Sequence, residues 1–497
     1  MLRRALVTFA LISVAFYNSP HAVIPLPRVT GPLPERPDSY PFGGAAHTRV
    51  PTNLTAIGYV EEEFLVSGTA NVYDWPKPGP AVVRTPDAPY TTRVLIRRPA
   101  NRARFSGIAI VEMLNPSNLV DLNIGWAISQ KQIARAGDAW VGITAKPVSV
   151  RSLKAFDQAR YAPLSWANPL PVTDPRNCAT VPRDSERTTE NGLVWDVHRQ
   201  VGAWLKSSEK TNPLSYGQPK TAVTHLIAWG YSQSGGFLYT FLTEIHPLDI
   251  QERIRPLFDG YLIGVASGPS PIHQCAGAIP ADDPRRQIKD ANVPVIRVMT
   301  QSDYLPSIRA RLPDGDAWPN RMRNYEIAGS AHATPDELNF AATPDDIIKA
   351  QRPVPPMACN EGPRSRFPNS IAFNAILENL ELWIRKGVAP PPSQNIEVGN
   401  NKPFLDKVGN VRGGMRSPYV DVPTSVWHAN ATGESFCRIA GYEVPFEAEQ
   451  LRALYPTKAA YEQAVEANVA ELVKQRSIPA ADGKDLVEEA KKMMWKY

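Results

Sequence analysis

The chain has 497 residues, of which 43% are apolar and 21% charged, with Lys+Arg 54 against Asp+Glu 49 and a formal net charge of +5. These shares are those of ordinary globular proteins, which excludes a disordered chain and a coiled coil. The small positive charge is scattered rather than gathered in a stripe, so we expect no nucleic-acid partner. The 49 prolines predict many fixed loops between short elements.

Residues 1–22 have the pattern of a signal peptide. Arg3 and Arg4 precede an apolar run from Ala5 to Phe16, and small residues up to Ala22 offer cleavage points. This run is too short to cross a bilayer, which takes about 20 residues. We expect a secreted or periplasmic protein without integral membrane association.

The chain has four cysteines, which suit an oxidising compartment. They are widely spaced and include no CxxC pair that would indicate zinc or a redox motif: Cys178, Cys275, Cys359 and Cys437. We expect at least one disulfide, and the sequence leaves all three possible pairings open.

Patterning along the chain predicts an α/β fold with a mostly parallel sheet covered by helices on both faces. Short apolar runs typical of buried strands alternate with helical segments. The strand-like runs are 93–96, 107–112, 139–143, 223–229, 258–265, 293–300 and 325–327, and the helical ones are 122–136, 193–206 and 371–385. One domain with insertions fits this order better than two domains.

The remaining segments flank or interrupt this domain. Residues 23–55 are rich in Pro and Gly and are interpreted as an extended arm before a domain at 56–445. Residues about 145–190 lack a clean period and are too long for an ordinary loop, so we expect a cap insertion there. Residues 446–497 carry apolar residues at helical spacing, which predicts a helical C-terminal extension.

The most informative segment is Gly230-Tyr231-Ser232-Gln233-Ser234-Gly235, which follows a predicted strand and precedes a helical run. A nucleophilic serine on such a strand-turn-helix needs small residues two positions before and after it. Gly230 and Ser234 meet this need around Ser232. A rival frame centres on Ser234, and an ordinary glycine-rich turn is the non-catalytic alternative.

An acid and a histidine follow in the order that such a site requires. The run 293–300 ends at Gln301-Ser302-Asp303, and the run 325–327 leads to His332. In the Ser-Asp-His arrangement the histidine takes the serine proton and the acid fixes the imidazole tautomer. We expect Ser232, His332 and Asp303 in these roles, with Asp314 or Asp316 as the next acid candidates.

Stabilisation of an oxyanion needs two backbone N–H groups. One is expected from Gln233, directly after the serine, and the other from the loop Met113-Leu114-Asn115-Pro116-Ser117. Pro116 has no N–H, so Asn115 or Leu114 is the candidate.

The chain resembles the α/β-hydrolases, specifically the large exported α/β-hydrolase-domain proteins with a Gly-Tyr-Ser-Gln-Ser-Gly elbow. The elbow is also similar to that of cutinases, and the long insertions to those of tannase and feruloyl esterases. The resemblance covers about residues 55–490 and includes 114–117, 383–387, 409–416 and 451–456. It implies the triad Ser232, Asp303 and His332, although relatives often carry a glutamate at the position of Gln301.

These residues predict a serine hydrolase that cleaves a carboxylic ester or lactone from a small-molecule or polymer-derived substrate. An amidase or peptidase with the same triad is the alternative, as is a non-catalytic binding protein with the same fold. No metal-binding motif, dinucleotide fingerprint or P-loop is present in the sequence, so no cofactor or metal is expected.

The insertions are expected to select the ester. The segments 145–190, 266–290 and 303–322 follow strand ends, where binding loops of parallel sheets gather. We expect them to cap Ser232 and select a bulky ester, with a pocket lined by apolar residues that include Tyr161, Leu164, Trp166, Tyr304, Leu305 and Trp318.

Overall fold

The computed structural model describes residues 24–75, 81–253, 255–308 and 311–494. The predicted signal peptide, residues 1–22, lies outside the described residues. Within the described ranges, no helix combines the length and apolarity needed to cross a membrane.

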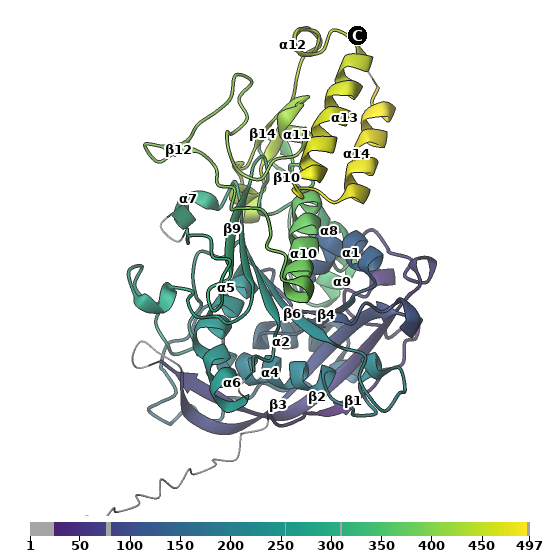
Figure 1. The fold of residues 1–497 in the computed structure, drawn as a ribbon. Coiled ribbons are helices and arrows are strands. Elements are labelled where there is room, and N and C mark those ends of the chain that lie inside the picture. Colours follow the sequence, from purple (N-terminus) through teal and green to yellow (C-terminus); the bar gives the residue numbers. More distant parts are fainter. Residues whose placement is uncertain (1–23, 76–80, 254, 309–310, 495–497) are drawn as a thin grey trace, which may run out of the picture.

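In the described part of the chain, nine strands form one sheet in the order β1-β2-β3-β5-β4-β6-β7-β8-β9 (Figure 1). Neighbours from β5 to β9 run parallel, whereas β1, β2 and β3 form an antiparallel edge that joins the rest where β3 pairs with β5. The strands are β1 (Arg28–Thr30), β2 (Tyr59–Asp74), β3 (Val82–Pro99), β4 (Ile108–Met113), β5 (Ala139–Ile143), β6 (His225–Tyr231), β7 (Gly260–Gly264), β8 (Val295–Thr300) and β9 (Met322–Ile327). All residues of β4, β5, β7, β8 and β9 are buried, which explains the largely apolar sequences of the first four, whereas β9 also buries Arg323, Asn324 and Glu326.

Helices cover both faces of this sheet, so the predicted fold class is confirmed. Helices α1 and α10 contact each other on one face, and α5 packs on the other against β6 and β7 (Figure 1). The helices are α1 (Ile124–Ala136), α2 (Pro147–Phe156), α3 (Gln158–Tyr161), α4 (Val194–Leu205), α5 (Gln233–Thr240), α6 (His246–Arg253), α7 (Tyr304–Ser307), α8 (Asp336–Asn339), α9 (Pro344–Lys349), α10 (Asn369–Lys386), α11 (Pro418–Asp421), α12 (Ala448–Leu454), α13 (Lys458–Lys474) and α14 (Ala480–Lys492). Outside this sheet, the described residues form three short hairpins: β10 (Ala358–Cys359) with β11 (Gly362–Pro363), β12 (Val398–Gly399) with β13 (Lys402–Pro403), and β14 (Ser425–His428) with β15 (Tyr442–Pro445).

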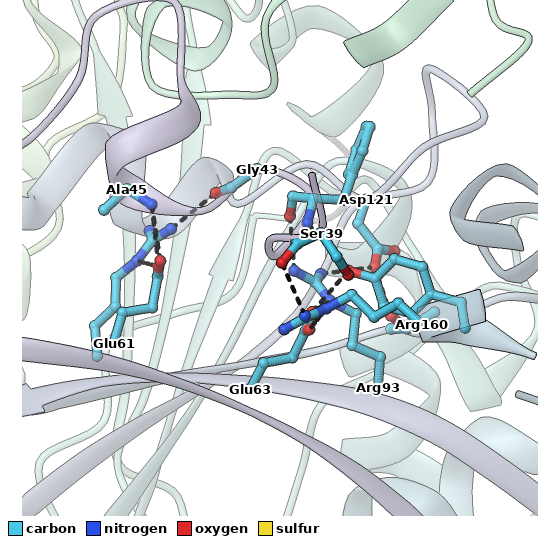
Figure 2. Close-up of polar contacts among 12 residues, drawn as sticks. Ser39, Gly43, Ala45, Glu61, Glu63, Arg93, Asp121 and Arg160 are labelled. Carbon is cyan, nitrogen blue, oxygen red and sulfur yellow. Dashed lines mark hydrogen bonds and ion pairs between the residues drawn. The ribbon is translucent and has the colours of Figure 1, made fainter. Parts of the chain in front are cut away.

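The N-terminal arm is joined to the sheet by strand pairing and by buried charges. Its first residues form β1 at the sheet edge. Arg93 on β3 donates to the Phe42 carbonyl at 2.6 Å and pairs with Glu63 on β2, which also accepts from Arg160 at 2.5 Å. Figure 2 shows this cluster between the arm, the long hairpin and the insertion. The arm is therefore part of the folded domain.

The insertion contains more regular structure than its sequence predicts. Helices α2 and α3 lie in its first half. Disulfides join Cys178 to Cys275 and Cys359 to Cys437, which confirms the expectation of at least one disulfide and selects one of the three pairings. The first disulfide attaches the insertion to the loop after β7.

The C-terminal extension is helical, as predicted. Helices α13 and α14 lie side by side at the end of the molecule (Figure 1). They share a small apolar core with parts of α10 and the segment before α12, separate from the main core around the sheet.

Candidate active site

Ser232 lies at a sharp turn between the central strand β6 and helix α5. Its backbone has φ 58° and ψ −118°, a conformation that costs a non-glycine residue about 1–3 kcal/mol. A Cβ atom at Gly230 would collide with the Ser234 carbonyl, so the turn requires glycine there. These features are those of a nucleophile elbow, in which a tight turn presents a serine at the end of a strand.

The two candidate serines lie in different environments. The Ser234 hydroxyl is fully buried, donates to the Tyr231 carbonyl at 3.1 Å and accepts from the Tyr231 N–H at 3.1 Å. Ser232 is half-buried and lines a cleft. The Ser234 side chain therefore closes the turn, while Ser232 is the serine that a ligand can reach.

Asp303 and His332 meet beside this turn, each on the loop that follows a parallel strand. The His332 Nδ1 atom lies 2.9 Å and 3.0 Å from the two Asp303 carboxylate oxygens. Thr300 donates to the same carboxylate, and the His332 N–H donates to the Ser302 hydroxyl at 2.9 Å. Both side chains are thus held by neighbours on the two loops.

The other acid candidates lie elsewhere. Asp314 accepts from the Ser393 N–H at 2.8 Å, and Asp316 pairs with Arg323. Gln301 accepts from the Gly329 N–H at 2.7 Å and so ties the two loops together. In the described residues, Asp303 is the carboxylate within hydrogen-bond distance of the His332 ring.

Charges around His332 favour its protonated form. Burial alone would lower the pKa of His332, but the Asp303 carboxylate, by charge and hydrogen bond, raises it above its usual value, and Glu337 adds to the increase. Burial raises the pKa of Glu337 itself to about 7, against the lowering effect of His332 and Arg364. Sequence reasoning missed Glu337, although its place shortly after His332 was visible.

A narrow cleft, with a cavity volume of about 20 Å³, brings Ser232, His332, Asn115 and Glu337 together. The Gln233 N–H lies in the first turn of α5, where amide groups have no carbonyl partner within the helix. Asn115 reaches the cleft as expected, but its N–H donates to the Leu122 carbonyl at 2.9 Å and its Nδ2 to the Tyr231 carbonyl at 2.6 Å. Both Asn115 donors are therefore engaged in holding the loop against the elbow.

The apolar residues expected to line the pocket do not line the cavities described for this part of the chain. Four are buried in the main core, namely Tyr161, Leu164, Trp166 and Tyr304, whereas Leu305 and Trp318 are exposed. The insertion instead contributes Val148, Arg151, Arg183 and Asp184 to a second cavity. Within the described residues, no group of three His, Cys, Asp or Glu side chains is placed to hold a metal ion.

Several solved structures resemble this chain at low identity and low TM-score. Similar solved structures include a Rhizomucor miehei esterase, with 8% identity and a TM-score of 0.29, covering 59% of this chain and 81% of that one. A serine hydrolase without a lid from Xanthomonas campestris has 10% identity and a TM-score of 0.28, over 58% of this chain and 97% of that one. A carboxylesterase from Lactobacillus plantarum has 10% identity and a TM-score of 0.26, over 45% and 74%.

Among curated proteins, none matches the sequence. The family assignment rests on a family profile, described as an alpha/beta hydrolase domain, that matches residues 29–488. This match spans nearly the whole described chain. The chain belongs to the α/β hydrolase domain family.

Proposed function

We propose that the protein is a serine hydrolase that cleaves a carboxylic ester through an acyl-enzyme on Ser232. The observation that carries the proposal is the pairing of His332 with Asp303 at the cleft that Ser232 lines. Nδ1 of the imidazole faces the carboxylate, so Nε2 on the opposite side of the ring is the atom that exchanges protons with substrate and serine.

In the first half-reaction the Ser232 Oγ attacks the ester carbonyl carbon and its proton passes to His332 Nε2. The tetrahedral intermediate then expels the alcohol oxygen, which takes that proton and leaves as the free alcohol. Water repeats the sequence on the acyl-enzyme and releases the carboxylic acid. Asp303 keeps its charge throughout and stabilises the imidazolium.

The Gln233 N–H is the proposed first donor to the oxyanion, because it directly follows the nucleophile at the start of α5. Asn115 N–H serves as the second donor only by exchanging its bond to the Leu122 carbonyl for one to the substrate.

The site of action is proposed to lie outside the cytoplasm. The two disulfides fit an oxidising compartment, since cytosolic thiols are normally kept reduced. This agrees with the export signal that the sequence predicts at residues 1–22.

A fluorophosphonate probe and a panel of 4-nitrophenyl esters test the proposal. We expect one equivalent of label on the purified protein and none on Ser232→Ala, whose ester hydrolysis falls by about 10⁴-fold or more. Ser234→Ala is the matched control, which still takes the label because its hydroxyl only braces the turn. Label retained in Ser232→Ala and lost in Ser234→Ala would contradict the assignment, and turnover of anilides above that of esters would favour an amidase.

A further inference from the structure

A cavity of about 810 Å³ lies beside the cleft of the proposed triad. Ser117, Asn118 and Phe436 line both spaces, so the cavity and the cleft are direct neighbours. The Gln233 side chain joins them as well, because it contacts the Ser117 hydroxyl at 3.4 Å and the Asp184 carboxylate at 3.5 Å. A substrate whose ester group reaches Ser232 can therefore extend into the cavity.

The lining of the cavity combines two chemical kinds of residue. Prolines and Val354 in the segment 353–356, with Phe436, are apolar. Three arginines also line the cavity: Arg151 on α2, Arg183 later in the insertion and Arg352 after α9. An apolar pocket with a few convergent charged groups is the usual form of a small-molecule site.

The cationic side chains are only partly matched by carboxylates. Arg151 pairs with Glu186, and Asp184 accepts from Lys146 at 2.5 Å. Arg352 donates through Nε to the neutral Ser152 hydroxyl at 2.7 Å. Among the lining residues, the three arginines are accompanied by two carboxylates, Asp184 and Glu434, which leaves one positive charge. Outside the lining, the charges of Lys146 and Glu186 cancel.

The arginines also repel one another. Burial first, and then the neighbouring charge of Arg151, lowers the pKa of Arg352, although Glu186 opposes this change. A guanidinium stays protonated in proteins, so the repulsion is relieved by an added anion rather than by loss of the proton. The single excess charge fits a monoanionic carboxylate, whereas Glu434 and Asp184 would repel a dianion such as phosphate.

We propose that this cavity binds a free carboxylate of the substrate, which makes the protein a hydrolase of acid half-esters. Such a compound carries one ester bond for Ser232 and, across an apolar body, one carboxylate for the arginines. The inference rests on the proposed esterase function. An arginine presents a planar fork that matches a carboxylate in two hydrogen bonds, which supplies the discrimination.

A matched substrate pair tests the proposal: the mono-4-nitrophenyl ester of glutaric acid and its methyl-capped, neutral analogue. We expect the wild-type protein to show a kcat/KM roughly tenfold or more higher for the anionic ester, mainly through KM. High salt should reduce this preference, because the arginines are partly exposed to solvent.

Variants with opposite expected signs sharpen the test. Arg352→Gln and Arg183→Gln should reduce the anionic-to-neutral ratio at least severalfold, whereas Glu434→Gln, at an exposed position, should increase it. Arg366→Gln, an exposed arginine that lines neither cavity, is the control and should leave the ratio unchanged. Equal kcat/KM for the two esters in the wild-type protein, or a ratio insensitive to these changes, overturns the inference.

A binding measurement separates this inference from the proposed function. Monomethyl glutarate is itself an acid half-ester, so calorimetry uses the Ser232→Ala variant, which cannot hydrolyse it. We expect binding to that variant and weaker binding when Arg352→Gln is added. Binding without hydrolysis of either ester would support the carboxylate site and contradict the esterase function. Hydrolysis of the neutral ester without binding of monomethyl glutarate would support the esterase function and contradict the carboxylate site.

Discussion

The Asp303 carboxylate holds the His332 imidazole through the Nδ1 atom of the ring. In Asp303→Asn the amide offers an N–H as readily as a carbonyl, so the tautomer with Nδ1 unprotonated is stabilised and Nε2 can no longer accept the Ser232 proton. We expect kcat to fall by about 10⁴-fold, as in the protease triad. Steady-state kinetics with a neutral ester check this, and an unchanged circular dichroism spectrum is the control for folding. Near-normal turnover would move the acid to another residue.

Glu337 should shift the pH dependence of activity. His332 acts as a base only when neutral, so activity falls as the pH drops through the His332 pKa, which lies above its usual value. Glu337→Gln removes a carboxylate that stabilises the imidazolium and leaves the charge of Arg364 beside it, so the His332 pKa falls. We therefore expect the acid limb of kcat/KM to move to lower pH.

A pH profile of Glu337→Gln measures this shift directly. Glu62→Gln, on the antiparallel edge of the sheet, is the control and should leave the limb in place. A limb that stays fixed in Glu337→Gln would mean that this carboxylate does not act on His332.

At the scale of elements, β2 carries two neighbouring glutamates that face opposite sides. Glu63 is fully buried between Arg93 and Arg160, whereas Glu62 pairs with Arg98 and is 21% exposed. Breaking a buried ion pair leaves unmatched charge and costs about 3–5 kcal/mol, and this cost falls toward about 0–1 kcal/mol as the pair becomes exposed to solvent. We expect Glu63→Gln to lower the free energy of unfolding by several kcal/mol and Glu62→Gln, whose pair is half-buried, to lower it less.

Denaturant titration of both variants measures these differences. Limited proteolysis of the arm should also accelerate in Glu63→Gln, because Arg93 and Arg160 both bond to the arm's carbonyls. Equal stability of the two variants would show that the cluster does not secure the arm.

The elements that were predictable from the sequence are those whose pattern is set by burial alone. The parallel strands appear as unbroken apolar runs, and α10 shows a regular apolar period. Helix α2 was missed because it is only ten residues long, begins at Pro147 and lies in an insertion that otherwise lacks a clean period. β1 was missed because its three residues owe their conformation to pairing with β2.

The candidate site also contains residues that the sequence predicts and residues that it does not. Ser232, Asp303 and His332 were predictable because each follows a strand in the order that the fold requires. The three arginines that line the second cavity were not, because Arg352 is distant in the sequence from Arg151 and Arg183 and joins them only in the folded chain. The role of Asn115 depended on backbone hydrogen bonds, which leave no signal in the sequence.

For the molecule as a whole, the two disulfides lie in segments that line the second cavity, where we propose that a carboxylate binds. Cys437 directly follows Phe436, and Cys178 lies in the insertion that carries Arg183. Removing a disulfide typically costs about 2–4 kcal/mol of stability. We expect reduction by dithiothreitol to lower the melting temperature and the anionic-to-neutral preference, while hydrolysis of the neutral ester persists.

Calorimetry and the substrate pair measure both effects. The variant with all four cysteines replaced by serine is the control, and dithiothreitol should leave it unchanged. If the anionic-to-neutral ratio of kcat/KM is unchanged after reduction, the residues that line the cavity keep their arrangement without the disulfides.

The strained backbone of Ser232 favours the proposed activity at the expense of thermal stability. Its positive φ is readily adopted by glycine, so Ser232→Gly should relieve the local cost and raise the melting temperature of a protein that no longer hydrolyses esters. A lower melting temperature would show that the serine side chain contributes more than its backbone costs. Selection for stability alone would therefore tend to erase this residue, and its retention would report continuing selection for catalysis.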